Sequence, residues 1–282
     1  MSRLRPAAAA LACALCLTAM AAPPPAARSA PAPSPARQPV KPWILDFGET
    51  TCSAVRIYGT DADPVTLAFR PSPNGPIVRL AIARKGRIGD AHHFPVTVAL
   101  GPTPLKTTGL RFATRDNKSN LVWINIERPL LDGLAATGRI TLSGGREIEE
   151  TLALPGIREV LRRLDDCNTE LRQYWNAGEF AAALAKPPEP VRPAHTWVSD
   201  ADYPAQAQAE GASGALRFSV LIDETGKVRD CLVEETSGIA TLDAQACIAV
   251  TRSARFRPAL DAAGKPARSS WGTRFVYRTM ID

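Results

Sequence analysis

The sequence predicts an α+β protein in which a sandwich-like, β-rich region is closed by a helix and followed by a small β–β–α–β region. Short runs rich in β-branched residues alternate with turn signals over residues 43–178, and a long amphipathic helix pattern ends that region. A proline cluster at 187–190 then separates it from a second patterned region, 193–282. A chain of 282 residues is long enough for two domains of ordinary size. We therefore expect two folded domains joined by a proline-rich linker at 179–192.

Seven runs in the first region read as strands. They are separated by turn signals such as Pro73-Asn-Gly75 and Ser143-Gly-Gly145. Short, regularly spaced strands are typical of a sandwich or a rolled sheet. The expected strands cover residues 55–58, 65–69, 77–82, 96–100, 109–112, 121–126 and 139–142.

Two helices are expected in the same region, a short one over residues 129–137 and a longer one from about Gly156 to Trp175. In the longer helix, apolar residues recur at three- and four-residue steps and form one stripe. Cys167 lies on that stripe, which would place it against the sheet that holds Cys52. We interpret the region as a folding module, with a substrate pocket as the alternative. The stripe consists of Ile157, Val160, Leu161, Leu164, Cys167, Leu171 and Tyr174.

The second region begins with apolar residues at alternate positions. Leu216, Phe218, Val220 and Ile222 occupy every second position, which predicts a half-buried strand. A turn at 223–226 leads into a partner strand over residues 227–235. A helix capped by Thr241 follows, with Asp243 in its first turn, and the region ends in a strand over about 269–278. In that last strand, Trp271, Thr273, Phe275 and Tyr277 would share one face, and Arg274, Val276 and Arg278 the other.

The front of the chain indicates export. Two arginines precede a short apolar run from Ala7 to Ala19, and Ala19-Met20-Ala21 has the small side chains that signal peptidase cuts after. The run is too short and too rich in alanine for a comfortable membrane span. We expect residues 1–21 to be a signal peptide and the mature chain to be periplasmic. An uncleaved segment would instead anchor it at the inner membrane.

Residues 22–42 consist mainly of Pro, Ala, Ser, Arg and Gln. Such a composition cannot bury a core and is typical of an extended, semi-rigid spacer. The formal net charge of +6 falls to +4 once Arg3 and Arg5 are removed. That modest charge, without a basic run interleaved with aromatic residues, gives no case for nucleic acid as a partner.

Cysteine usage agrees with an oxidising compartment. Two of the six cysteines lie in the expected signal peptide, which leaves Cys52, Cys167, Cys231 and Cys247. An even number in an exported chain favours disulfides, and four cysteines allow three pairings. Local packing favours Cys52–Cys167 and Cys231–Cys247, one pair in each domain. No metal site is expected, because Cys-x-x-Cys is absent and the adjacent His92 and His93 would point to opposite faces of a strand.

An ordered set of short motifs runs through residues 193–282: Tyr203-Pro204, Asp223-Glu-Thr-Gly226, Phe256-Arg-Pro258-Ala259, Gly264-Lys-Pro266 and a final strand. This set resembles the C-terminal domain of the TonB family, the periplasmic modules that couple inner-membrane energy to outer-membrane receptors. Two departures stand beside the resemblance. Asp200-Ala201 occupies positions where the family often has Gln-Pro, and residues 22–42 form a shorter arm than typical TonB transducers carry.

The resemblance implies a binding mode as well as a fold. The family's domain binds a short extended segment of an outer-membrane receptor, which adds as a strand beside the last strand. Trp271, Phe275 and Tyr277 are interpreted mainly as core residues, since strand addition needs only open backbone groups. The implied receiving strand comprises Trp271, Gly272, Thr273, Arg274, Phe275, Val276, Tyr277 and Arg278.

These observations lead to a periplasmic TonB-family protein that takes part in energy-coupled transport. Its partner would be an outer-membrane receptor or another envelope protein, with homodimer formation through the last strand as an alternative. A motor complex would be a partner only if the N-terminal segment stays attached. The sequence carries no recognisable catalytic motif, so we expect neither an enzyme nor a cofactor. The alternatives are an envelope adaptor without energy transduction and, third, an enzyme in residues 43–178.

Overall fold

The structure is a computed structural model, and it describes residues 35–114, 117–199, 202–203, 205–209, 211 and 213–278. The expected signal peptide lies outside the described residues, and so do the spacer as far as residue 34, Asp200-Ala201 and Pro204. Processing at Ala22 therefore stays a prediction.

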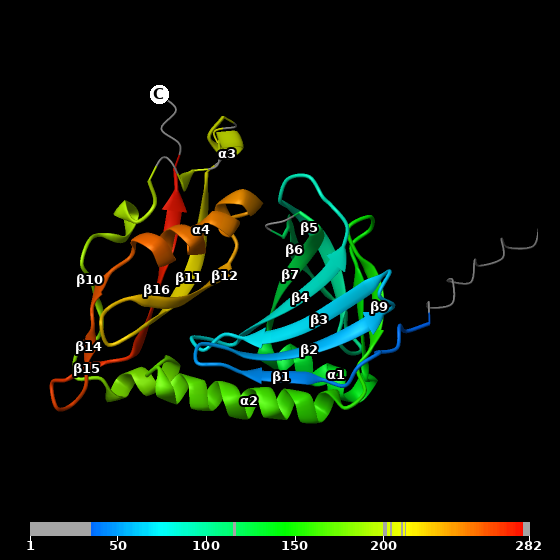
Figure 1. The fold of residues 1–282 in the computed structure, drawn as a ribbon, viewed down its shortest axis with the longest axis horizontal. Coiled ribbons are helices and arrows are strands. Elements are labelled where there is room, and N and C mark those ends of the chain that lie inside the picture. Colours follow the sequence, from blue (N-terminus) through cyan, green and yellow to red (C-terminus); the bar gives the residue numbers. More distant parts are fainter. Residues whose placement is uncertain are drawn as a thin grey trace, which may run out of the picture. The chain divides into compact units, whose positions relative to one another are not determined.

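Within the described residues, nine strands form one antiparallel curled sheet in the order β1-β2-β3-β4-β7-β6-β5-β8-β9 (Figure 1). The segment of residues 37–40 forms bridges both to a strand near the start of this order and to the strand at its end. Arg37 pairs with Leu152 in β9, and Pro39 pairs with Tyr58 in β2. The strands are β1 (Ile44–Phe47), β2 (Cys52–Gly59), β3 (Pro64–Pro71), β4 (Ile77–Lys85), β5 (His92–Ala99), β6 (Leu105–Ala113), β7 (Ser119–Glu127), β8 (Arg139–Ser143) and β9 (Glu149–Ala153).

The helices of this part lie where the sequence analysis expected them. A 3₁₀ turn, η1 (Arg128–Leu131), leads into α1 (Asp132–Thr137), and α2 spans Ile157–Tyr174. The apolar stripe of α2 is buried at Leu161, Leu164 and Leu171. The predicted disulfide Cys52–Cys167 joins β2 to α2. We call the curled sheet with α1 and α2 the sheet module.

Two features of the sheet module differ from the expectation. One curled sheet takes the place of the two sheets of a sandwich, because most neighbouring strands follow one another through short turns. This arrangement corresponds to the rolled sheet that the strand pattern also allowed. Strands β1 and β9 were not among the strands expected from the sequence. In β9 a charged residue, Glu150, is buried beside Arg37 and Arg84 at 3.4 and 3.6 Å, so hydrophobic alternation does not reveal the strand.

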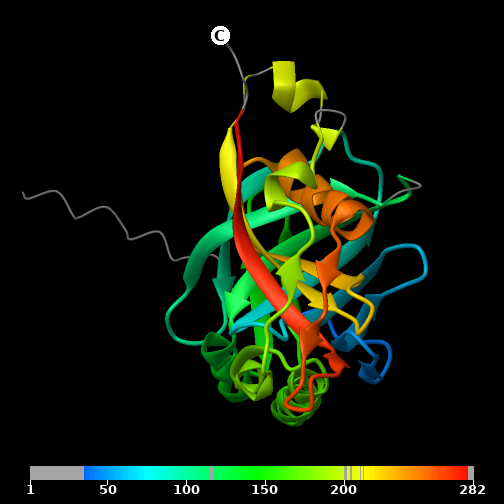
Figure 2. The same cartoon turned by 90° about the vertical axis from the view of Figure 1, so that its left-hand side faces the viewer.

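The C-terminal module has the expected β–β–α–β order. It contains β11 (Gly214–Ile222), β12 (Val228–Glu235), α4 (Ala240–Ser253) and β16 (Ser269–Tyr277). The sheet order is β12-β11-β16, so β11 is central. Figure 2 shows β16, in red, at the front of this module. The smaller elements are η2 (Gly178–Ala183), β10 (Glu189–Pro190), η3 (Ala194–Thr196), α3 (Ala205–Ala209), β13 (Phe256–Arg257), β14 (Ala259–Leu260) and β15 (Pro266–Ala267).

The core of the C-terminal module lies between its sheet and α4. Trp197, Phe218 and Leu242 are among its most buried side chains. The second predicted disulfide, Cys231–Cys247, joins β12 to α4. The helix begins at Ala240 after Ile239, with no side-chain cap, so the expected cap at Thr241 is wrong. Asp243 lies in the first turn as expected, but its carboxylate accepts a hydrogen bond from the backbone of Ser237.

The expected linker at 179–192 is tied to the C-terminal module. Within it, β10 pairs with β13, and Lys186 forms a bridge with Leu260. The buried apolar residues of the described chain form two clusters, one centred on each module, but Leu221 of β11 packs with the cluster of the sheet module. That the two modules fold as independent domains stays a prediction.

Candidate partner-binding edge

The candidate receiving strand, β16, is an edge strand. Among the described residues it pairs only with β11, from Gly214 opposite Tyr277 to Ile222 opposite Ser269. The register is continuous over all nine pairs. The side of β16 that faces away from β11 carries no other strand of the described chain.

The side chains of β16 alternate as the sequence predicted. Tyr277 is buried, and Trp271, Thr273 and Phe275 are partly buried. Gly272 and Arg274 are exposed, and Val276 is 50% exposed. The strand therefore has one face in the core and one face toward solvent.

The aromatic residues on the inner face pack into the core cluster. The ring of Trp271 lies 5.3 Å from that of Trp197 and 5.4 Å from that of Phe256, centre to centre. The ring of Tyr277 lies 5.6 Å from that of Tyr203, the described half of the Tyr203-Pro204 motif. Burial raises the pKa of the Tyr277 phenol. These contacts fit the interpretation of the aromatic residues as core.

The backbone direction of β16 follows from its neighbour. A Cβ built on Gly272 would lie 3.2 Å from the carbonyl oxygen of Phe218, so that oxygen points toward β16. Successive residues of a strand direct their N–H and C=O groups to opposite sides. Because Phe218 is opposite Thr273, Thr273 directs its backbone groups to β11. Gly272, Arg274 and Val276 therefore direct their N–H and C=O groups outward.

The exposed face beside this edge is positively charged. Arg217 of β11 is opposite Glu235 of β12 and forms an ion pair with it at 3.1 Å. On its other side Arg217 is opposite Arg274 of β16. Neither Arg274 nor Arg278 forms a salt bridge with any residue that the structure describes.

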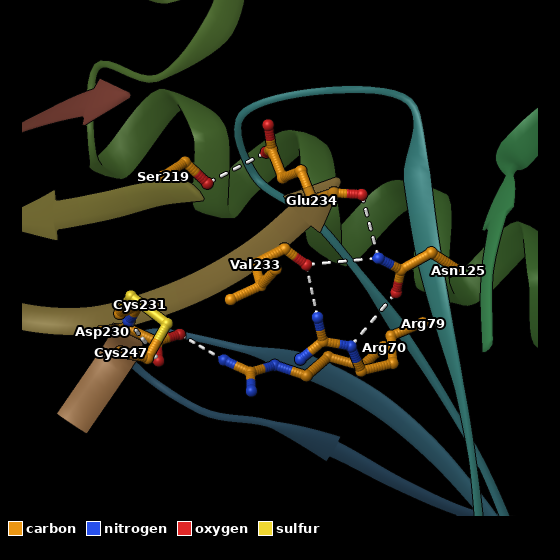
Figure 3. Close-up of a disulfide and its surroundings, with 9 residues drawn as sticks. All are labelled: Arg70, Arg79, Asn125, Ser219, Asp230, Cys231, Val233, Glu234 and Cys247. Atoms are coloured by element: carbon orange, nitrogen blue, oxygen red, sulfur yellow. Dashed lines mark hydrogen bonds and ion pairs between the residues drawn. A yellow bond between two sulfur atoms is a disulfide. The ribbon is translucent and has the colours of Figure 1, made fainter. Parts of the chain in front are cut away.

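The other edge strand of this sheet, β12, receives hydrogen bonds from side chains of the sheet module. Asn125 of β7 donates to the carbonyl oxygens of Val233 and Glu234, at 3.2 and 3.0 Å. Arg79 of β4 also donates to the Val233 carbonyl, and its Nε donates to Asn125 Oδ1 at 3.2 Å (Figure 3). Side chains of the sheet module thus occupy carbonyl groups that an added strand would need.

Arg79 is unusual because it is a buried cation on the outer face of the sheet module. Its residue is 6% exposed, and its guanidinium lies 4.2 Å from the ring centre of Trp123. Burial lowers the pKa of Arg79 to about 9, and the charge of Arg70 adds to this effect. The cation–π contact and the backbone acceptor partly compensate the loss of hydration.

A β-bulge in β12 directs a carboxylate into the same contact. Val233 and Glu235 pair with consecutive residues of β11, which leaves Glu234 as the extra residue. Its Oε1 accepts from Ser72 at 3.0 Å and from Ser219 at 2.9 Å. The bulge therefore joins the two modules through Glu234.

Two further pairs flank the bulge. Arg70 of β3 forms an ion pair with Asp230, next to the Cys231–Cys247 disulfide (Figure 3). His93 Nε2 of β5 lies 3.2 Å from Asp243 Oδ2. Burial alone would raise the pKa of Asp243, but hydrogen bonds from His93, Ser237 and Thr236 outweigh burial and lower it.

A cavity of about 450 Å³ adjoins this contact, lined by Arg79, His93, Trp123, Asn125 and Asp243 among others. Four of these five side chains already bond across the contact between the two modules, which favours a structural role over catalysis. The described residues contain no cluster of three or more His, Cys, Asp or Glu that could hold a metal ion. None of the described helices combines the length and apolar character needed to span a membrane.

Residues 199–279 match the family described as Gram-negative bacterial TonB protein C-terminal. The match confirms the resemblance seen over residues 193–282. No curated protein matches the chain. The match covers the C-terminal module, and the family that it names is associated with energy-coupled transport in the cell envelope. The family is a non-enzymatic one of energy transducers, and its members interact with outer-membrane proteins.

Proposed function

We propose that this chain acts in the periplasm and uses the β16 edge of its TonB C-terminal domain to bind a segment of an outer-membrane transporter. The segment adds to the sheet as a fourth strand and so takes part in energy-coupled transport. The observation that carries the proposal is the outward direction of the Gly272, Arg274 and Val276 backbone groups on an uncovered edge. The β12 edge is unsuited to this role, because the sheet module occupies its carbonyl groups.

Strand addition makes a specific demand on the edge. Main-chain hydrogen bonds supply affinity, so exposed side chains should be replaceable while outward N–H groups should not. Proline removes one N–H group and is tolerated on edge strands. Val276→Pro removes an outward donor at an exposed position, and Val276→Ala is the matched control that keeps the donor.

The test uses labelled peptides copied from periplasm-facing segments of outer-membrane transporters, with binding followed by fluorescence anisotropy. Circular dichroism first establishes that both variants fold, and mass in solution separates dimers from complexes. We expect Val276→Ala to bind within about twofold of the wild type and Val276→Pro to lose at least about tenfold, the equivalent of one charge-free hydrogen bond left unmade. Equal binding by the two folded variants would reject strand addition at β16.

A further inference from the structure

The exposed face of the C-terminal sheet carries an incomplete row of charges. Glu235 of β12, Arg217 of β11 and Arg274 of β16 are consecutive cross-strand neighbours. Directly opposite like charges destabilise a sheet, whereas opposite charges stabilise it. Glu235 compensates Arg217, but Arg274 has no acidic neighbour among the described residues. An acidic residue could compensate the charge of Arg274 from a strand added on the outer side of β16.

A second exposed arginine, Arg278, comes directly after the last residue of β16. Arg278 follows Val276 at the next position of the same parity and is exposed. Arg274 and Arg278 are four residues apart, or about 14 Å along an extended strand. Between them Val276 is 50% exposed and pairs with Ala215, so an apolar position separates the two cations.

We propose that the strand received by β16 is acidic on one face, with two carboxylates four residues apart opposite Arg274 and Arg278 and an apolar residue between them opposite Val276. This inference rests on the proposed strand addition and names the chemistry of its partner. An acidic residue opposite Arg274 would complete the row of cross-strand neighbours, so that each of the two arginines, Arg217 and Arg274, has one acidic neighbour. On its other face the partner would present apolar residues to the partly buried rings of Trp271 and Phe275.

The same charges disfavour two of the ways in which a second copy of this chain could pair with β16. In an antiparallel pair of β16 strands, a two-fold axis at Arg274 places that residue opposite its own copy, and an axis at Val276 places Arg274 opposite Arg278. Both registers bring like charges together. An axis at Thr273 or Phe275 places Arg274 opposite Gly272 or Val276 and leaves it without an acidic partner, which an acidic foreign strand supplies.

The experiment uses nine-residue peptides, acetylated and amidated, with threonine and valine alternating around two variable positions. The first peptide has glutamate at positions 3 and 7, which lie on one face of a strand. The second has glutamine at both positions. The third has glutamate at positions 3 and 6, which has the same net charge but divides the carboxylates between two faces. Affinity for the full chain is measured at low and at high salt.

We expect the 3,7-glutamate peptide to bind about fourfold to twenty-fivefold more tightly than the glutamine peptide at low salt, since an exposed cross-strand pair contributes about twofold to fivefold. The 3,6 isomer should keep only part of that gain. High salt should reduce the difference, and the double variant Arg274→Gln/Arg278→Gln should remove it. Equal affinities for the 3,7-glutamate and glutamine peptides, or for the 3,7 and 3,6 isomers, would overturn the proposal.

Val276→Pro separates this inference from the proposed function, because it leaves both arginines in place. If strand addition is right and acidic selection is wrong, all three peptides bind alike and all are lost in Val276→Pro. If the 3,7-glutamate peptide keeps its advantage in folded Val276→Pro, the arginines attract it without strand pairing. That result would contradict both proposals, since the partner would then not be a strand.

Discussion

The two edge strands of the C-terminal sheet differ in whether the rest of the described chain binds their outward backbone groups. On β12, Asn125 and Arg79 of the sheet module donate to the carbonyl groups of Val233 and Glu234. On β16, the outward groups of Gly272, Arg274 and Val276 meet no other strand of the described chain. A small sheet has two edges able to accept a strand, and in this molecule the sheet module covers one of them.

The way β12 is covered differs from ordinary sheet pairing. The sheet module supplies side chains rather than a strand, so each contact depends on a particular residue: Arg79, Asn125, Ser72 or Arg70. Side chains thus occupy the hydrogen-bonding groups of this edge without adding a strand to the sheet. Occupied groups also make aggregation through the edge less favourable. The comparison predicts that substitutions at β12 mainly lower stability, whereas substitutions at β16 mainly lower the affinity for a partner strand.

The largest effect on the covered edge should come from the Cys231–Cys247 disulfide, which ties β12 to α4. Its cysteines are 16 residues apart, so chain entropy predicts a loss of about 3 kcal/mol in the double variant Cys231→Ala/Cys247→Ala. Denaturant unfolding of the C-terminal module measures this loss. Peptide binding at β16 by the folded fraction should change by less than about twofold, and a large loss of binding there would show that the two edges are coupled.

A smaller loss of stability is expected from Arg79→Ala. The change removes a charge-assisted hydrogen bond and a cation–π contact, but it also removes the cost of burying the cation. We expect a net loss of about 2 kcal/mol in the free energy of unfolding, measured in urea. The matched control is Arg274→Ala on the open edge, which should change stability by no more than about 0.5 kcal/mol. Equal effects of the two alanine variants would show that the β12 contact does not stabilise the molecule.

A third prediction uses pH to sharpen the comparison at β12. The pKa of Asp243 is lowered in the folded chain, so its contribution to stability is present above the ordinary aspartate pKa of about 3.9 and is lost as pH falls through the folded value. Asp243→Asn should therefore cost about 1–2 kcal/mol at pH 7, from weakened charge-assisted hydrogen bonds, and much less at pH 3. Urea unfolding of both proteins at the two pH values provides the measurement. A pH-independent difference would contradict the assigned role of the carboxylate.

The smallest effect is expected at the proline cluster, since it concerns cleavage and not stability. Residues 187–190 mark the predicted domain boundary, and part of this segment pairs with β13. Limited proteolysis is expected to cut there and release two fragments, each resistant to further digestion. A resistant chain with no cut between Trp175 and Ala201 would argue that the two modules behave as one unit.

Local patterns in the sequence were sufficient for most of the fold. Alternation predicted β11 and β16, three- and four-residue spacing predicted α2, and cysteine packing predicted both disulfides. The misses have a physical cause. Glu150 is a buried charge paired with two arginines from distant segments, so β9 lacks the apolar signal of a strand.

The contact at β12 could not be predicted from the sequence. Arg79, His93 and Asn125 are polar residues on strands, and such residues usually mark a face in water. Only the C-terminal module covers that face, and its position depends on contacts between residues more than a hundred positions apart, such as Asn125 and Glu234. The bulge at Glu234 could not be predicted from the sequence pattern either, because it depends on how β11 and β12 pair.

The most direct test of the account is amide hydrogen exchange of the full chain, with and without a bound transporter segment. In the free protein, the outward N–H groups of Gly272, Arg274 and Val276 should exchange rapidly, because no strand covers them. Binding should protect these residues and leave the exchange of β12 unchanged. Protection that appeared along β12 instead, or that left 272–276 unaffected, would contradict the claim that β16 is the receiving edge and β12 the closed one.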